Sequence, residues 1–146
     1  METMKNKANP VLDDFPAKAF DKIRYSDTDR QGHVNNAVFS TFLETGRVEM
    51  LLSPEEPMLS EGTSFVIANL NLQLLAEIHW PGKVDIGTGV LSIGNSSIRL
   101  YQGVFQNGRC VATAETVIVQ VDDTTARSSS LSEQARALLS RYQFDQ

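Results

Sequence analysis

The chain has 146 residues, 41% of them hydrophobic and 21% charged, which is the usual size and balance of one globular domain and excludes a disordered chain. Asp and Glu total 18 against 13 Lys and Arg, and the resulting net charge of −5 argues against general binding to nucleic acid or to anionic membranes. The one cysteine, Cys110, excludes an intrachain disulfide and a cysteine-based zinc cluster. No apolar run is long enough for a signal peptide or a membrane span, so we expect a cytoplasmic protein.

The first half of the chain predicts a polar lead-in over residues 1–18, a strand over 19–26 and a helix over 36–52. In the strand, Ile23 and Tyr25 share one face. Asn35 or Asn36 can cap the start of the helix, and Ser53-Pro54 ends it, because the residue before a proline is driven out of the helical conformation. Apolar residues at three- and four-residue spacings form one stripe along this helix: Val38, Phe39, Phe42, Leu43, Gly46, Met50 and Leu51.

The second half predicts four strands and a short helix. Over residues 66–80 every even position is apolar, which is the period of a strand. Three further alternating runs cover 84–93, 98–106 and 109–121, and Asn107-Gly108 is a typical hairpin turn because both central residues of a type I′ turn need positive φ. We therefore expect an antiparallel meander after the long helix. Residues 131–142 predict a C-terminal helix started by Ser130 or Ser132.

This order of elements predicts the fold class. One strand, one helix of about 17 residues and a longer antiparallel series indicate an α+β fold, in which an antiparallel sheet wraps around one long central helix and covers its apolar stripe. We expect this domain to span residues 19–124, with residues 125–146 forming a linker and a short helix.

One loop, between the first strand and the long helix, concentrates the polar groups that could carry chemistry. It contains two carboxylates, Asp27 and Asp29, one histidine, His33, and two amides, Asn35 and Asn36. Asp and Asn also favour turns and caps for local hydrogen-bonding reasons, so their spacing alone favours a structural role.

Four short motifs in and after this loop resemble the signature of the 4-hydroxybenzoyl-CoA thioesterase-like branch of hotdog proteins, an acyl-CoA thioesterase family. The motifs are Asp27-Thr28-Asp29, Gly32-His33-Val34-Asn35-Asn36, Phe42-Leu43-Glu44 and Arg47. The likeness runs from about Phe20 to Val121. It implies the hotdog fold, hydrolysis of acyl-CoA to free acid and CoA without metal or organic cofactor, and a homodimer or homotetramer with active sites between protomers.

The resemblance assigns catalysis to Asp29 and a structural role to Asp27. A carboxylate can attack a thioester as nucleophile or activate water as general base, since a thiolate with a thiol pKa of ~8.5 is a good leaving group. The free N–H groups where the helix begins, at Asn35 and Asn36, can hold the developing oxyanion. A serine-hydrolase mechanism has little support because the chain has no Gly-x-Ser-x-Gly motif.

Other site residues are implied by a likeness to the acyl-carrier-protein thioesterases of plants, in which the positions of Asp29, Gln31, His33 and Glu77 gather at the site. Gly32 and Asn35 complete the supporting loop. For His33, a loop histidine bonded to backbone is an equal alternative. Glu44 is a reserve carboxylate, because a second hotdog branch takes its carboxylate from the helix, although a structural pair between Glu44 and Arg47 is favoured.

The substrate class follows from the same comparison. Asn35 and Asn36 stand where aromatic-acyl members carry bulky aromatic residues, so the likeness favours a medium or long aliphatic acyl-CoA. The alternatives are an acyl-carrier-protein thioesterase, an aromatic acyl-CoA thioesterase and a non-catalytic acyl-binding hotdog protein. Four cations are available for the coenzyme's phosphates, although each is equally explained as solvated surface charge: Lys83, Arg99, Arg109 and Arg127.

Overall fold

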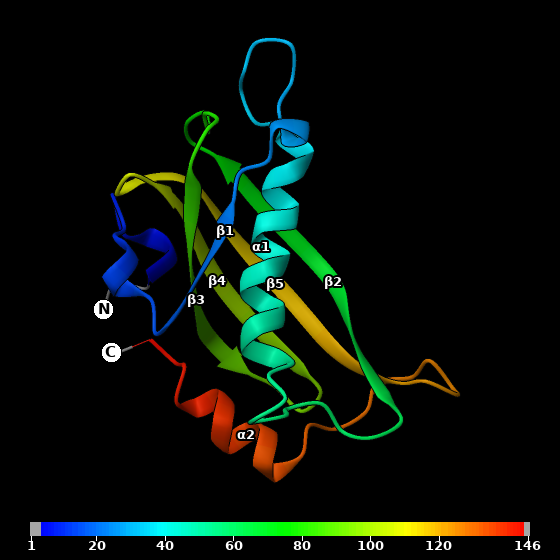
Figure 1. The fold of residues 1–146 in the computed structure, drawn as a ribbon. Helices are drawn as coiled ribbons and strands as arrows, with labels where there is room; N and C mark the ends of the chain where they lie inside the picture. The colour runs from blue at the N-terminus through cyan, green and yellow to red at the C-terminus, as the bar shows by residue number, and fades with distance from the viewer. Residues whose placement is uncertain (1–3, 145–146) are drawn as a thin grey trace.

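A computed structural model describes residues 4–144, so residues 1–3 of the predicted lead-in and residues 145–146 of the predicted C-terminal segment lie outside it. A five-stranded antiparallel sheet curves around one long helix, α1, which confirms the predicted α+β class (Figure 1). The elements are η1 (Met4–Asn6), η2 (Leu12–Asp14), β1 (Ala17–Lys22), η3 (Tyr25–Asp27), α1 (Asn36–Leu51), β2 (Thr63–Leu74), β3 (Lys83–Ile93), β4 (Ser97–Gln106), β5 (Arg109–Asp122) and α2 (Glu133–Ser140).

Helix α1 begins and ends close to the predicted positions. Asn35 is its N-cap, and the Asn35 side chain accepts a hydrogen bond from the Ala37 N–H at 3.1 Å. The apolar stripe faces the sheet, with Phe42 and Leu43 fully buried. At Gly46 the helix lies so close to the sheet that an added Cβ would meet Ile86 Cγ2 at 2.6 Å. This contact sets the distance between α1 and the centre of the sheet.

The strand order is β1-β3-β4-β5-β2, so the predicted meander is correct only for β3, β4 and β5. Strand β2 pairs with β5, not with β3, and ends at Leu74, not at Trp80. Beyond Leu74, the N–H groups of Leu75 and Ala76 both donate to the carbonyl of Val111, which interrupts the ladder. The alternating residues that follow leave the sheet, and His79 pairs with His33 instead.

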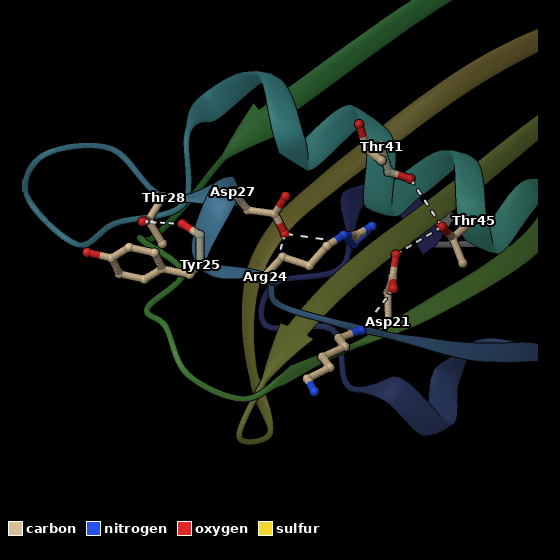
Figure 2. Close-up of polar contacts among 8 residues, drawn as sticks. Asp21, Arg24, Tyr25, Asp27, Thr28, Thr41 and Thr45 are labelled. Atoms are coloured by element: carbon tan, nitrogen blue, oxygen red, sulfur yellow. Dashed lines mark hydrogen bonds and ion pairs between the residues drawn. The ribbon is translucent and has the colours of Figure 1, made fainter.

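The first strand is also shorter than predicted. It ends at Lys22, because Tyr25–Asp27 forms the single 3₁₀ turn η3. The N–H of Thr28 donates to the Tyr25 carbonyl at 3.1 Å, and the Thr28 hydroxyl donates to the same oxygen at 2.7 Å (Figure 2). This turn directs the chain away from the sheet and into the loop that precedes α1, which extends past the end of the sheet in Figure 1.

Both ends of the described chain pack onto the sheet. Phe15 is 1% exposed, and Phe15 and Phe144 form a T-shaped aromatic contact beside Tyr101. Helix α2, capped by the Ser132 side chain, adds buried residues to the core near the C-terminal end of α1. Ser132 is one of the two predicted caps. Among residues 4–144, no helix combines the length and the apolar character needed to cross a membrane.

The two edges of the sheet are β1 and β2. Strand β2 has 12 residues, and much of its apolar surface is accessible: Val66, Ile67, Leu70 and Leu74 are between 38% and 49% exposed. A long apolar edge strand of this kind presents unpaired backbone groups to any partner that can add a strand.

Candidate active site

The loop from Asp29 to Val34 is closed by its own hydrogen bonds. The Asp29 N–H donates to the His33 carbonyl at 2.8 Å, and the Gly32 N–H donates to the Asp29 carbonyl at 3.2 Å. Gly32 has a φ of +80°, a conformation that glycine adopts without strain. The Asp29 carboxylate is held in the same loop, because its Oδ1 accepts from the N–H groups of Gln31 at 2.8 Å and His33 at 3.2 Å.

Asp27 has different surroundings from Asp29. Its Oδ2 accepts a hydrogen bond from the Arg24 N–H at 2.8 Å and lies 3.9 Å from the Arg24 guanidinium. Figure 2 shows the Asp27 side chain turned toward Arg24. The Asp27 carbonyl also accepts from the Asn35 N–H at 2.8 Å, which ties the end of η3 to the cap of α1. Asp27 therefore fixes the local backbone, and Asp29 lies on the exposed part of the loop.

The start of α1 offers a backbone donor next to this loop. The N–H groups of Ala37 and Val38 are used by the side chain and the carbonyl of Asn35. Within the part of the chain that the structure describes, no acceptor is found for the N–H of Asn36. The first N–H groups of a helix also carry the positive end of its dipole, so this position favours an oxyanion.

A cavity of about 450 Å³ joins these groups. Five of the predicted site residues line it: Asp29, Gln31, His33, Asn36 and Glu77. The two other supporting residues, Gly32 and Asn35, shape the loop and the cap beside it. An apolar wall completes the cavity, made by Val34, Phe39, Leu74, Leu75 and Ala76. This wall is not predicted from the sequence, because three of its members lie where β2 ends and the chain bends, and only the bend directs them to the loop.

His33 and Glu77 lie close together, although one belongs to the loop before α1 and the other to the segment after β2. His33 Nε2 is 3.2 Å from Glu77 Oε2, and His79 Nε2 is 3.7 Å from the same oxygen. The two imidazole rings form a T-shaped pair with centroids 5.0 Å apart. No role is predicted for His79 from the sequence. The alternating run could have indicated one, because residues two positions apart in extended chain share one face and His79 follows Glu77 by two.

A second cavity of about 510 Å³ adjoins the first and shares Leu75, Ala76 and Glu77 with it. Arg109 and His79 also line this second cavity. Of the other cations considered for the coenzyme, Lys83 pairs with Asp85 at 2.8 Å and Arg99 pairs with Glu115. Arg127 lies on the exposed turn after β5. Arg109 is therefore the cation of these four that the described residues place in the cavity adjoining that of Asp29.

The reserve carboxylate, Glu44, lies elsewhere. It lines a small apolar groove of about 140 Å³ between α1 and β2, away from the loop of Asp29. The favoured structural pair with Arg47 is wrong, because no ion pair joins these two residues among those of residues 4–144. Arg47 is buried and its Nη1 donates to Gln102 Oε1 at 3.4 Å. Burial lowers the pKa of Arg47 from its ordinary value, and the charge of Glu44 opposes this.

Comparison with known proteins places the chain in a family. Residues 23–139 match the model of the thioesterase-like superfamily. The acyl-CoA thioester hydrolase YbgC of Escherichia coli O6:H1 is 25% identical over 127 residues, which cover 84% of this chain and 92% of YbgC. A thioesterase from Thermus thermophilus, solved in complex with coenzyme A and Zn, is 30% identical with a TM-score of 0.74, over 88% of this chain and 94% of that one.

The fold alone extends to a more distant structure. The PA5185 protein of Pseudomonas aeruginosa strain PAO1 has a TM-score of 0.83 at 21% identity, over 94% of this chain and 98% of that one. The family match spans the Asp29 loop, α1 and all the strands that follow. The chain therefore belongs to the thioesterase-like superfamily and has its hotdog fold.

Proposed function

We propose that the protein hydrolyses an acyl-CoA thioester to free acid and CoA, with Asp29 as its catalytic carboxylate. The observation that carries this proposal is one cavity that contains the Asp29 carboxylate, the N-terminus of α1 at Asn36 and an apolar wall. These are the three groups that a thioester needs: a base or nucleophile, donors for the oxyanion, and a surface for the acyl chain. The relationship to the acyl-CoA thioester hydrolase YbgC supports the same reaction.

The reaction requires no further acid. Asp29 activates a water molecule or attacks the thioester carbonyl itself, and the oxygen that gains negative charge is stabilised by the N–H of Asn36. The C–S bond then breaks and CoA leaves as a thiolate, which takes a proton from solvent. Attack by water gives the free acid directly, and Asp29 returns the water's proton to solvent. Attack by Asp29 gives an acyl–Asp29 anhydride, which water hydrolyses to the free acid and the Asp29 carboxylate. His33, next to Glu77, orients the attacking water or the Asp29 carboxylate.

The acyl group we favour is a medium or long aliphatic chain. Phe39, Leu74 and Leu75 give the cavity an apolar side, and Asn35 and Asn36 occupy the positions where the aromatic-acyl branch carries bulky rings. For the coenzyme, the adjoining cavity provides Arg109, whose guanidinium suits a phosphate. The coenzyme A present in the related Thermus thermophilus thioesterase supports CoA as the carrier, and an acyl-carrier protein is the alternative.

We further propose that the active unit is a homodimer formed through β2. The Asp29 cavity is lined by Leu74 and Leu75, at the end of that edge strand, so a partner added along β2 would lie beside it. A homotetramer built from two such dimers remains an alternative assembly.

A thiol-release assay over a panel of aliphatic and aromatic acyl-CoA substrates, with acyl-carrier-protein thioesters in parallel, tests the reaction. Asp29→Asn should reduce turnover by roughly 10²-fold or more, because it removes the base and keeps the shape of the side chain. Asp27→Asn is the matched control and should reduce turnover less. Near-normal turnover of a folded Asp29→Asn protein would refute the assignment, and failure of every thioester would favour a non-catalytic acyl-binding protein.

A further inference from the structure

We propose that His33, Glu77 and His79 form a binding site for one divalent transition-metal ion, with Zn²⁺ as the favoured ion. Their three ligand atoms lie within 4.8 Å of one another. Two imidazole nitrogens and one carboxylate are a ligand set that suits Zn²⁺ when a water molecule fills the fourth position. Mg²⁺ and Ca²⁺ prefer oxygen ligands alone, so the two histidines select against them.

Two of the three separations between ligand atoms are close to those around a tetrahedral ion, and the third, between the two imidazoles, is at most 4.8 Å. Bonds of about 2.0–2.2 Å at tetrahedral angles separate neighbouring ligand atoms by roughly 3.4 Å. The Glu77 oxygen is 3.2 Å from His33 Nε2 and 3.7 Å from His79 Nε2. Binding would therefore draw the His79 imidazole, whose side chain is 60% exposed, toward His33 and Glu77.

The backbone holds the three residues in this arrangement. His33 and His79 face each other in an antiparallel bridge, and the Val34 N–H donates to the Ile78 carbonyl at 2.8 Å. Val34 and Ile78 are buried at 3% and 0% exposure. Each histidine is next to one of these anchors in the chain, and Glu77 precedes Ile78, so the alternation of extended chain turns all three ligands toward the opposite surface.

A second anchor fixes His79. The Gln106 amide accepts from the His79 N–H at 3.0 Å and donates to the His79 carbonyl at 2.7 Å. Both backbone groups of His79 are therefore bound by one side chain from the end of β4. The ligand side chains remain accessible, since those of Glu77 and His79 are each 60% exposed and that of His33 is 27% exposed. An ion can reach the site without unfolding of the chain.

The site lies between the two cavities. His33 and Glu77 line the Asp29 cavity, and Glu77 and His79 line the cavity of Arg109. A metal ion held there would occupy the passage between them and remove His33 from the reaction. We therefore infer that Zn²⁺ inhibits hydrolysis of the thioester. This consequence rests on the proposed function, whereas the binding of the ion does not.

The test measures binding directly, on full-length protein without a histidine tag and without substrate. Zn²⁺ titration by calorimetry and the visible spectrum of bound Co²⁺ should each give one ion per chain, and Mg²⁺ should not displace it. His79→Ala and Glu77→Gln should each weaken binding by at least about 10-fold. Cys110→Ala is the control for the other zinc-type ligand and should bind as the wild type does, with circular dichroism showing that each variant is folded.

Three outcomes would overturn the site: no binding by the wild type, binding that survives His79→Ala unchanged, or binding that is lost in Cys110→Ala. Inhibition is measured separately, as the ratio of turnover with and without Zn²⁺ in the wild type. Binding without inhibition would retain the metal site and refute only its placement in the substrate passage. Absence of thioester hydrolysis in metal-free wild type would refute the proposed function and leave the binding result intact.

Discussion

At the scale of single residues, the carboxylates of Asp27 and Asp29 have different surroundings although they lie only two positions apart. Asp27 accepts from the Arg24 backbone and its own carbonyl binds Asn35, so it joins η3 to the cap of α1. Asp29 uses Oδ1 for two N–H groups of its own loop and lines the cavity. The motif alone does not separate these tasks by geometry, because both residues favour turns. The separation depends on the 3₁₀ turn that ends at Asp27.

Cys110 provides a pH-dependent prediction at this scale. Burial raises the pKa of the Cys110 thiol above its ordinary value, so the folded protein holds less thiolate at a given pH than the unfolded chain does. Alkylation by iodoacetamide at pH 8 should be several-fold slower in the native protein than in urea, and the native rate should still rise with pH where the unfolded rate levels off. Mass spectrometry over a pH series measures both rates. Equal rates at pH 8 would contradict the raised pKa of this half-buried thiol.

At the scale of elements, the start of α1 predicts the effect of a proline. Asn36 is the first helical residue, where proline is tolerated, and Asn35 has φ −58° and ψ 137°, which suits a residue before proline. Asn36→Pro should keep the helix, remove the proposed oxyanion donor and lower turnover by roughly 10²–10³-fold. Asn36→Ala keeps the N–H and should lose less than about tenfold in turnover. Steady-state kinetics on both variants distinguish the backbone N–H from the side chain. Equal losses of turnover in the two variants would assign the role to the side-chain amide of Asn36.

The contact between α1 and the sheet predicts a loss of stability at Gly46. A Cβ there would lie 2.6 Å from Ile86 Cγ2 and 3.0 Å from both Thr88 Oγ1 and Gln102 Nε2. Gly46→Ala should therefore lower the free energy of unfolding by about 1–3 kcal/mol, although alanine is the better helix former. Urea denaturation measures the change, and Glu49→Ala on the exposed side of α1 should change it by less than about 0.5 kcal/mol. A stabilised Gly46→Ala protein would mean that the sheet gives way at this contact.

The elements also show how much could be predicted from the sequence. Periodicity located α1 and the strands β3, β4 and β5 because each is bounded by a turn, a cap or a proline. It extended β2 to Trp80, since alternation continues through Ile78 while the hydrogen-bonding partner changes from β5 to the Asp29 loop. The local pattern of apolar residues indicates how the side chains alternate between two faces. It does not indicate which segment the backbone pairs with. The resemblance brought His33 and Glu77 to one site, whereas the position of His79 beside them depends on that change of partner and was not predicted.

At the scale of the whole molecule, the sheet leaves two edges of different character. β1 is an edge of 6 residues that carries lysines, whereas β2 is twice as long and has accessible apolar side chains. Charged, short edges resist pairing, and long apolar edges favour it. If β2 paired edge to edge with the β2 of a second copy, related by a two-fold axis, the free N–H and C=O groups of both strands would be satisfied. The resulting closed dimer would also cover this apolar surface. The same arrangement would place the partner against the end of the Asp29 cavity.

This asymmetry predicts which edge substitution breaks the assembly. Leu70→Lys puts a charge on β2, where it would be buried between protomers, so sedimentation at micromolar concentration should show a folded monomer. The matched control is Phe20→Lys on β1, where Phe20 is 67% exposed. This variant should sediment as a dimer. The Leu70→Lys monomer should also lose most of its turnover although Asp29 is intact, because the proposed partner beside the Asp29 cavity would be absent. If the wild type itself sediments as a monomer with full turnover at nanomolar concentration, Asp29 acts within one chain and β2 is covered in some other way.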